Sequence, residues 1–150
     1  MEPRPLAILH LSDPAILSGL AADATADGRR MVSRLIEEWA EGVNRFDGTG
    51  ERAYVAVAGG SVVAVCGLNI DPFAGDPLVG RVRRLYVAAG ERHRGVGSVM
   101  MTVLAEEARG HFQVLHLRTD DAGASAFYEA LGFTRVEGVP NCTHRRSVGG

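Results

Sequence analysis

The sequence predicts one domain of the α/β class, and three observations indicate it. Two β-rich runs flank a two-glycine turn at Gly59 and Gly60, which is the pattern of a hairpin. A strand-like run at 82–87 leads through a glycine turn into a helix-like run, and two helical stretches come earlier in the chain. With 150 residues, 46% of them hydrophobic, the chain can form one full core, so we expect a single domain over residues 1–150.

The first third of the chain predicts one strand and two helices. Leu6–Leu11 is a short apolar run, as expected of a strand. Asp13 and Pro14 are typical of a helix start, and this helix should continue to about Ala24. A second helix is expected from about Gly28 to Phe46. The residues expected to face the core are Ile16, Leu17, Leu20 and Ala21 in the first helix, and Met31, Val32, Leu35, Ile36, Trp39, Val43 and Phe46 in the second.

The remainder predicts a sheet with two more helices. The hairpin strands should be 53–58 and 61–68, followed by a loop at 71–80 and a central strand at 82–87. The next helix should bury Val99, Met100, Val103, Leu104 and Ala108 and end at Gly110. A strand at 114–118 and a short helix ending at Leu131-Gly132-Phe133 come next, and residues 133–137 should pair with 142–148.

The turn between the central strand and its helix predicts an anion site. A strand that ends on such a turn leaves the first N–H groups of the helix pointing together, with the positive end of the macrodipole behind them. Gly95 and Gly97 lack the Cβ atoms that would keep a pyrophosphate from the backbone, and Arg92 and Arg94 supply forked donors for phosphate oxygens. A glycine turn without a ligand is the alternative, since such turns also join strands to helices.

Two other phosphate loops are excluded by the residues present. The dinucleotide fingerprint needs a third glycine where this chain has Met100. The Walker loop needs a lysine, and the chain contains none, which also excludes lysine Schiff-base chemistry.

Two motifs together resemble the Gcn5-related N-acetyltransferase (GNAT) family. Arg92-His93-Arg94-Gly95-Val96-Gly97 matches the family's Arg/Gln-x-x-Gly-x-Gly/Ala signature, and the run 124–133, ASAFYEALGF, is similar to its late Phe-Tyr and Leu-Gly-Phe segment. The resemblance covers roughly residues 52–136. It implies a mixed, mostly antiparallel sheet of six or seven strands with helices on both faces, and a direct acetyl transfer from acetyl-coenzyme A to a primary amine, without a metal.

The resemblance also implies which residues bind the coenzyme. They are Leu85, Tyr86 and Val87 at the end of the central strand, Arg92, His93, Arg94, Gly95, Val96, Gly97 and Ser98 in the turn, and Asp121. Asp121 departs from the pattern, because many members have an asparagine there, and a carboxylate cannot donate a hydrogen bond and repels phosphate.

Tyr128 is the predicted catalytic residue. A tyrosine titrates near 10 and a thiol near 8.5, so protonation of a leaving thiolate by tyrosine is only mildly uphill. The resemblance assigns the general acid to the same position, whereas a tyrosine anchored by its ring alone is the structural alternative.

No residue is distinguished as the general base. Glu51, Asp71, Asp76 and His144 are candidates, and a water chain is an equal alternative. Arg83 and Arg84 are candidates for recognising an anionic acceptor, although strand arginines more often pair with nearby carboxylates or lie in solvent.

Charge and cysteine content limit the classes of partner and ligand that we expect. A net charge of −2 gives no global basic field for nucleic acid or an anionic membrane. Cys66 and Cys142 lack metal-ligand spacing, so both are expected to be reduced thiols. The N-terminal run has no signal-peptide pattern and no later run could span a bilayer, which indicates a cytoplasmic protein.

The acceptor is expected to be a small-molecule or peptide amine, and many relatives in the family form homodimers. Two rival functions differ in class. One is a catalytically silent acyl-coenzyme A sensor, and the other is a domain without coenzyme whose arginines bind nucleic acid.

Overall fold

The computed structural model describes residues 5–149 and contains a seven-stranded sheet in the order β1-β2-β3-β4-β5-β7-β6. Residues 1–4 and 150 of the expected 1–150 domain lie outside the described part. The strands are β1 Leu6–His10, β2 Arg52–Ala58, β3 Ser61–Ile70, β4 Val79–Val87, β5 Val114–Leu117, β6 Thr134–Arg135 and β7 His144–Ser147. The helices are η1 Pro14–Leu17, α1 Ser18–Ala26, α2 Met31–Ala40, η2 Ala89–Glu91, α3 Val96–Ala108 and α4 Ala122–Ala130.

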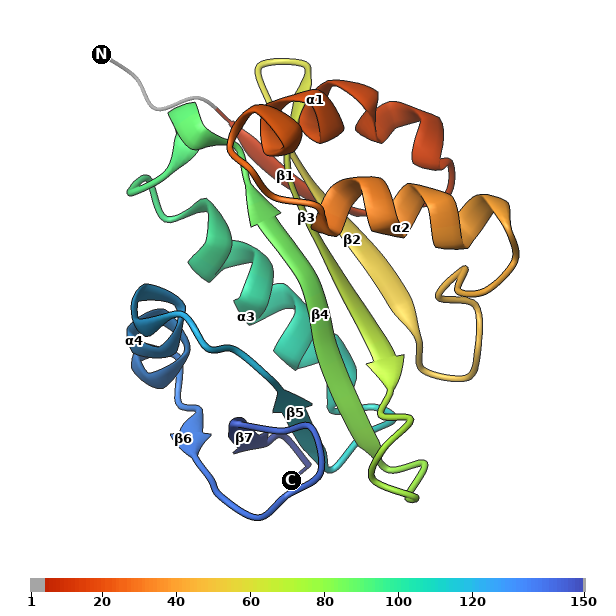
Figure 1. Ribbon diagram of the computed structural model, residues 1–150, viewed down its shortest axis with the longest axis vertical. Helices are drawn as coiled ribbons and strands as arrows, with labels where there is room; N and C mark the ends of the chain where they lie inside the picture. Colours follow the sequence, from red (N-terminus) through yellow and green to blue (C-terminus); the bar gives the residue numbers. More distant parts are fainter. Residues whose placement is uncertain (1–4, 150) are drawn as a thin grey trace.

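Helices cover both faces of the sheet, as the sequence predicts (Figure 1). The α1 and α2 helices close one core, which contains Leu17, Leu20 and Leu35. The α3 helix lies on the opposite face, where Met100 and Leu104 are fully buried against the strands. All neighbouring strands are antiparallel except β4 and β5, so the predicted mixed and mostly antiparallel sheet is confirmed.

The single parallel pair of strands separates after a short contact. β4 and β5 pair only from Val79 and Val114 to Arg81 and His116. Beyond those residues β4 continues to Val87, while the chain from β5 turns away to α4 (Figure 1). Among residues 5–149, the edge of β4 from about residue 82 onward therefore has no strand partner on the β5 side.

β4 also contains a bulge that the sequence does not mark. Val65 pairs with Tyr86 and Gly67 with Arg83, so two residues of β4 oppose one residue of β3. Arg84 takes up the extra length with a φ of 62°, a left-handed conformation that is uncommon outside glycine.

Three predicted core positions are wrong, each for a local reason. Ile16 is 48% exposed because the first turn is a 3₁₀ helix, whose three-residue period turns Leu17 inward instead. Val43 is 67% exposed because α2 ends at Ala40 rather than at Phe46, with Gly42 at a φ of 75°. Val99 is 45% exposed because it lies beside, not on, the buried stripe of α3.

Candidate active site

A cavity of about 560 Å³ occupies the space where β4 and β5 separate. Its lining comes from the end of β4, the turn before α3, the first turn of α3, the loop after β5 and the helix α4. All predicted site residues except Arg94 and Ser98 line this cavity. The two sequence motifs, which lie far apart along the chain, therefore meet at one place.

The N-terminus of α3 lies in the cavity wall and has the features of an anion-binding site. Gly95 is the N-cap residue with a φ of 78°, and no side chain of the described residues caps the helix or places a carboxylate in its first turn. The amides of Val96, Gly97 and Ser98 consequently have no partner within the helix. Free amides together with the positive end of the helix dipole favour a phosphate group at this point.

The two glycines of the turn serve different needs. A Cβ on Gly95 would meet open space, so glycine is needed here for its left-handed backbone and not for lack of room. A Cβ on Gly97 would lie 3.2 Å from Cζ of Phe127, so this glycine lets α3 approach α4 closely. His93 also adopts a left-handed φ, of 64°, a conformation that glycine adopts more readily than other residues.

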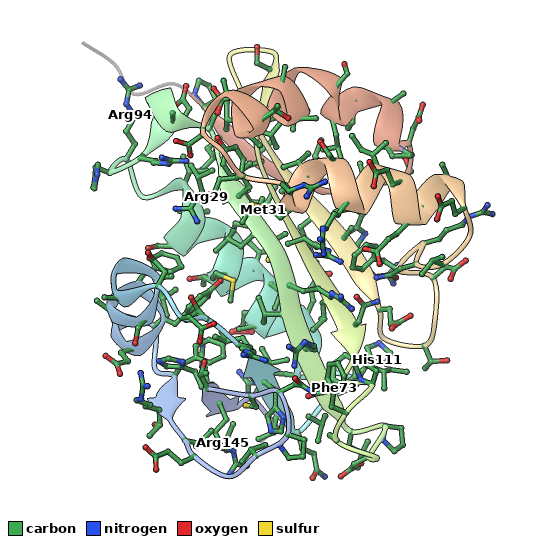
Figure 2. The ribbon with its side chains drawn as sticks, viewed as in Figure 1. Arg29, Met31, Phe73, Arg94, His111 and Arg145 are labelled. Carbon is green, nitrogen blue, oxygen red and sulfur yellow. The ribbon has the colours of Figure 1, made fainter. Side chains whose placement is uncertain are left out.

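The two arginines of the motif differ in their surroundings. Arg92 donates from Nη2 to Asp27 at 2.6 Å and from Nε to the Val87 carbonyl at 3.2 Å, which ties the turn to the end of α1. Its side chain also lies over the Tyr86 ring, 5.4 Å from the centroid. Arg94 has a 62% exposed side chain and lies at the outer edge of the molecule (Figure 2).

Arg29 and Met31 join the site from a distant segment that the sequence analysis missed. Both line the cavity, and both lie beside β4 at the start of α2 (Figure 2). Arg29 follows the end of α1 and its amide donates to the Ala24 carbonyl. No local pattern marks these two residues, because only the packing of α1 and α2 against β4 brings them to the cavity.

The end of β4 lines the cavity with every residue from Val82 to Val87. The Tyr86 hydroxyl points to the opposite face and donates to Asp23 of α1 at 2.6 Å. Burial and that carboxylate raise the pKa of Tyr86 to about 12. Tyr86 therefore fixes α1 on the sheet, and the unpaired edge of its strand is the part that remains for a ligand.

Tyr128 lies in the wall of the cavity and is 8% exposed. Its ring packs edge-on against Phe127 and Phe133, with centroids 5.2 and 5.6 Å away. Within residues 5–149 its hydroxyl has no hydrogen-bond partner. Burial raises the pKa of Tyr128 above its ordinary range, so the hydroxyl stays protonated and can donate. A hydroxyl with a raised pKa is a weaker acid than a free tyrosine, so full proton transfer to a thiolate is more uphill than expected from the sequence.

Asp121 lines the cavity as the N-cap of α4. Its Oδ2 accepts from the Ala124 amide at 2.7 Å, which stabilises the helix that carries Tyr128. The carboxylate is thus accounted for by a structural role.

None of the four candidate bases lines the cavity. Glu51 accepts from the amides of Gly48 and Ile70 and from Asn69. Asp71 is buried against His116, with Oδ2 3.0 Å from Nδ1. Asp76 accepts from the Leu78 amide in an exposed loop. His144 is fully buried, with both ring nitrogens hydrogen-bonded to the hydroxyls of Ser125 and Thr143.

Two other features of the described residues concern the classes of ligand. Among residues 5–149 no group of three or more His, Cys, Asp or Glu side chains could hold a metal ion. In the same part of the chain no helix is long and apolar enough to cross a bilayer.

Comparison with known proteins adds to this geometry. The model of the acetyltransferase (GNAT) family matches residues 16–133. A protein of Exiguobacterium sp. 255-15 assigned as an acetyltransferase has a similar structure, with a TM-score of 0.83 and 27% identity over 95% of this chain and 93% of that one. No curated protein sequence gives a significant match.

More distant structures share the fold. Ard1 from Thermoplasma volcanium has a TM-score of 0.72 at 20% identity, covering 97% of this chain and 99% of its own. The ribosomal-protein-S18-alanine N-acetyltransferase from Escherichia coli has a TM-score of 0.70 at 15% identity, covering 97% and 96%.

Proposed function

The chain belongs to the acetyltransferase (GNAT) family, and on that premise we propose that it transfers the acetyl group of acetyl-coenzyme A directly to a primary amine of a small molecule or peptide. The observation that carries the proposal is the continuity of one cavity from the uncapped first turn of α3 to Tyr128. A carrier whose diphosphate is joined by a long amide-rich arm to a terminal thioester fits a cavity of this kind.

Each part of the cavity has a chemical task in the proposed reaction. The free amides of Val96, Gly97 and Ser98 bind the diphosphate, each charge-assisted bond contributing about 1.5–3 kcal/mol. The unpaired edge of β4 accepts the amide-rich arm of the carrier along the strand. The Tyr128 hydroxyl donates to the departing sulfur. Overall the amine nitrogen bonds to the acetyl carbon, the carbon–sulfur bond breaks, and one proton passes from the amine to the sulfur.

The reaction is tested by measuring free thiol release from acetyl-coenzyme A against a panel of primary amines, with mass spectrometry of the products. We expect thiol release that depends on the amine and an acetylated product in equal amount. Release that is independent of every amine, without any acetylated product, would reject the proposal.

A catalytically silent acyl-coenzyme A sensor is the second candidate, because no expected base lines the cavity. The same experiment separates the two. A sensor would bind acetyl-coenzyme A, with a rise in the unfolding temperature, but would release no thiol with any amine.

A further inference from the structure

The bulge in β4 places two neighbouring arginines on one face of the sheet. Side chains of a regular strand alternate, so Arg83 and Arg84 should point to opposite faces. Val82 faces α3, whereas Tyr86 faces α1 and α2. Residues four apart in a regular strand share a face, so the change of face requires one extra residue between them. The extra residue is Arg84, which reaches Glu38 on α2. Arg83 shares a second cavity with Glu38, on the same face.

Only one of the two arginines has a carboxylate partner. Nη2 of Arg84 lies 2.6 Å from Oε1 of Glu38, in a pair with little exposure. Arg83 forms no ion pair or hydrogen bond with any residue between 5 and 149, and its Nε is buried without a partner. Burial, and secondly the charge of Arg84, lower the pKa of Arg83. A half-buried cation beside a like charge is costly unless a ligand supplies an anion.

Glu51 and Asp71, two carboxylates near Arg83, make their hydrogen bonds with other groups. Glu51 receives hydrogen bonds from two backbone amides and from Asn69. Asp71 is bound to His116, and its Oδ1 accepts from the Phe73 amide. Within residues 5–149 neither carboxylate forms an ion pair with Arg83, so the N–H donors of Arg83 remain available to an anionic ligand such as a carboxylate.

This cation lies apart from the diphosphate site. Three regular strand steps and the bulge residue separate Arg83 from Val87, which is about 10 Å, and Val87 is the strand residue that lies against Gly97. Both arginines nevertheless line the same cavity as Tyr128. An anion at Arg83 would thus belong to the second substrate and not to the diphosphate of the carrier.

We propose that the acceptor is a small amine that also carries a carboxylate, and that Arg83, assisted by Arg84, binds this carboxylate through its forked N–H donors. This inference rests on the proposed acetyl transfer and names its substrate class. The planar guanidinium matches a carboxylate in two parallel hydrogen bonds, which gives orientation as well as affinity. The bound carboxylate then holds the amine at a fixed distance from the acetyl carbon.

The test compares matched pairs of acceptors: α-, β- and γ-amino acids against their carboxamides, which keep the chain length but lack the anionic group, with rates compared at equal concentrations of neutral amine. We expect kcat/KM to be about 10- to 100-fold higher for the carboxylate member of the preferred pair. Arg83→Gln should abolish this preference, chiefly by raising the KM of the acceptor, with the KM of acetyl-coenzyme A unchanged. Arg34→Gln, at an exposed arginine of α2 outside the cavity, is the matched control and should retain the preference.

Calorimetric binding to the coenzyme A-saturated protein decides the inference even if no amine is acetylated. The inference is supported if the wild-type protein binds the carboxylate members and Arg83→Gln does not. It is overturned if carboxylates and carboxamides bind equally well. A preference for phosphorylated amines over carboxylates would also overturn it. Failure of acetyl-coenzyme A to bind at all would instead reject the proposed function, and unfolding temperatures of all variants show whether each one folds.

Discussion

At the scale of single residues, Tyr128 is the group on which the chemistry depends most. Its hydroxyl makes no hydrogen bond within the described chain, so removing the oxygen should leave the fold intact. We expect Tyr128→Phe to lower kcat by about 100-fold, because a positioned acid contributes roughly that factor. The KM of acetyl-coenzyme A and the unfolding temperature should change little. If steady-state kinetics show normal turnover for Tyr128→Phe, the tyrosine has only a structural role.

Asp23 predicts a pH dependence of stability. The Tyr86 hydroxyl, and then the Ala89 amide, hold the pKa of this carboxyl below its ordinary value of 3.8. A lowered pKa in the folded state means that the stabilisation is present above about pH 4 and is lost as the pH falls through the lower value. Urea unfolding of wild type and Asp23→Asn should therefore differ at pH 6 and converge in acid. A difference that stays constant with pH would contradict this role.

At the scale of elements, the first turn of α3 is predicted to contribute more to coenzyme binding than the arginines around it. Gly95→Val adds a side chain beside the free amides and strains a backbone with a φ of 78°. We expect it to weaken coenzyme A binding by more than about 10-fold in titration calorimetry, since several charge-assisted bonds are disturbed. Arg94→Ala should have the smaller effect, because this side chain is exposed and outside the cavity.

Gly75→Val is the matched control for that experiment. Gly75 also has a positive φ, of 66°, and open space around it, but it lies in the loop before β4 and outside the cavity. The Gly75→Val variant should lose as much stability as Gly95→Val but keep its affinity for coenzyme A. A loss of affinity equal to that of Gly95→Val would mean that general destabilisation, and not the turn, is responsible.

The elements also show what the sequence could and could not predict. Asp13, the glycine pair of the hairpin and the turn at Gly95 are local signals, and each forms the feature that its pattern predicts. The end of α2 was open to prediction as well, since Gly42 has the position of a C-terminal glycine stop. The bulge at Arg84 was not, because a left-handed arginine is imposed by pairing with β3 and contact with Glu38.

At the scale of the whole molecule, the site exists because β4 and β5 separate. The separation opens one edge of the central strand, and α4 then brings Tyr128 to the wall of this opening, in the same core as α3. Arg29 reaches the same cavity only through the packing of α1 and α2 on the sheet. Motifs along the sequence could therefore predict the glycine turn and the start of α3, whereas Arg29 reaches the cavity through contacts between distant segments.

A structure with coenzyme A bound tests the central claim most directly. The account predicts diphosphate oxygens within about 3.2 Å of the amide nitrogens in the first turn of α3, the normal hydrogen-bond distance, and the sulfur beside the Tyr128 hydroxyl. A coenzyme whose diphosphate lies elsewhere, with the amides of Val96 and Gly97 left to water, would contradict it.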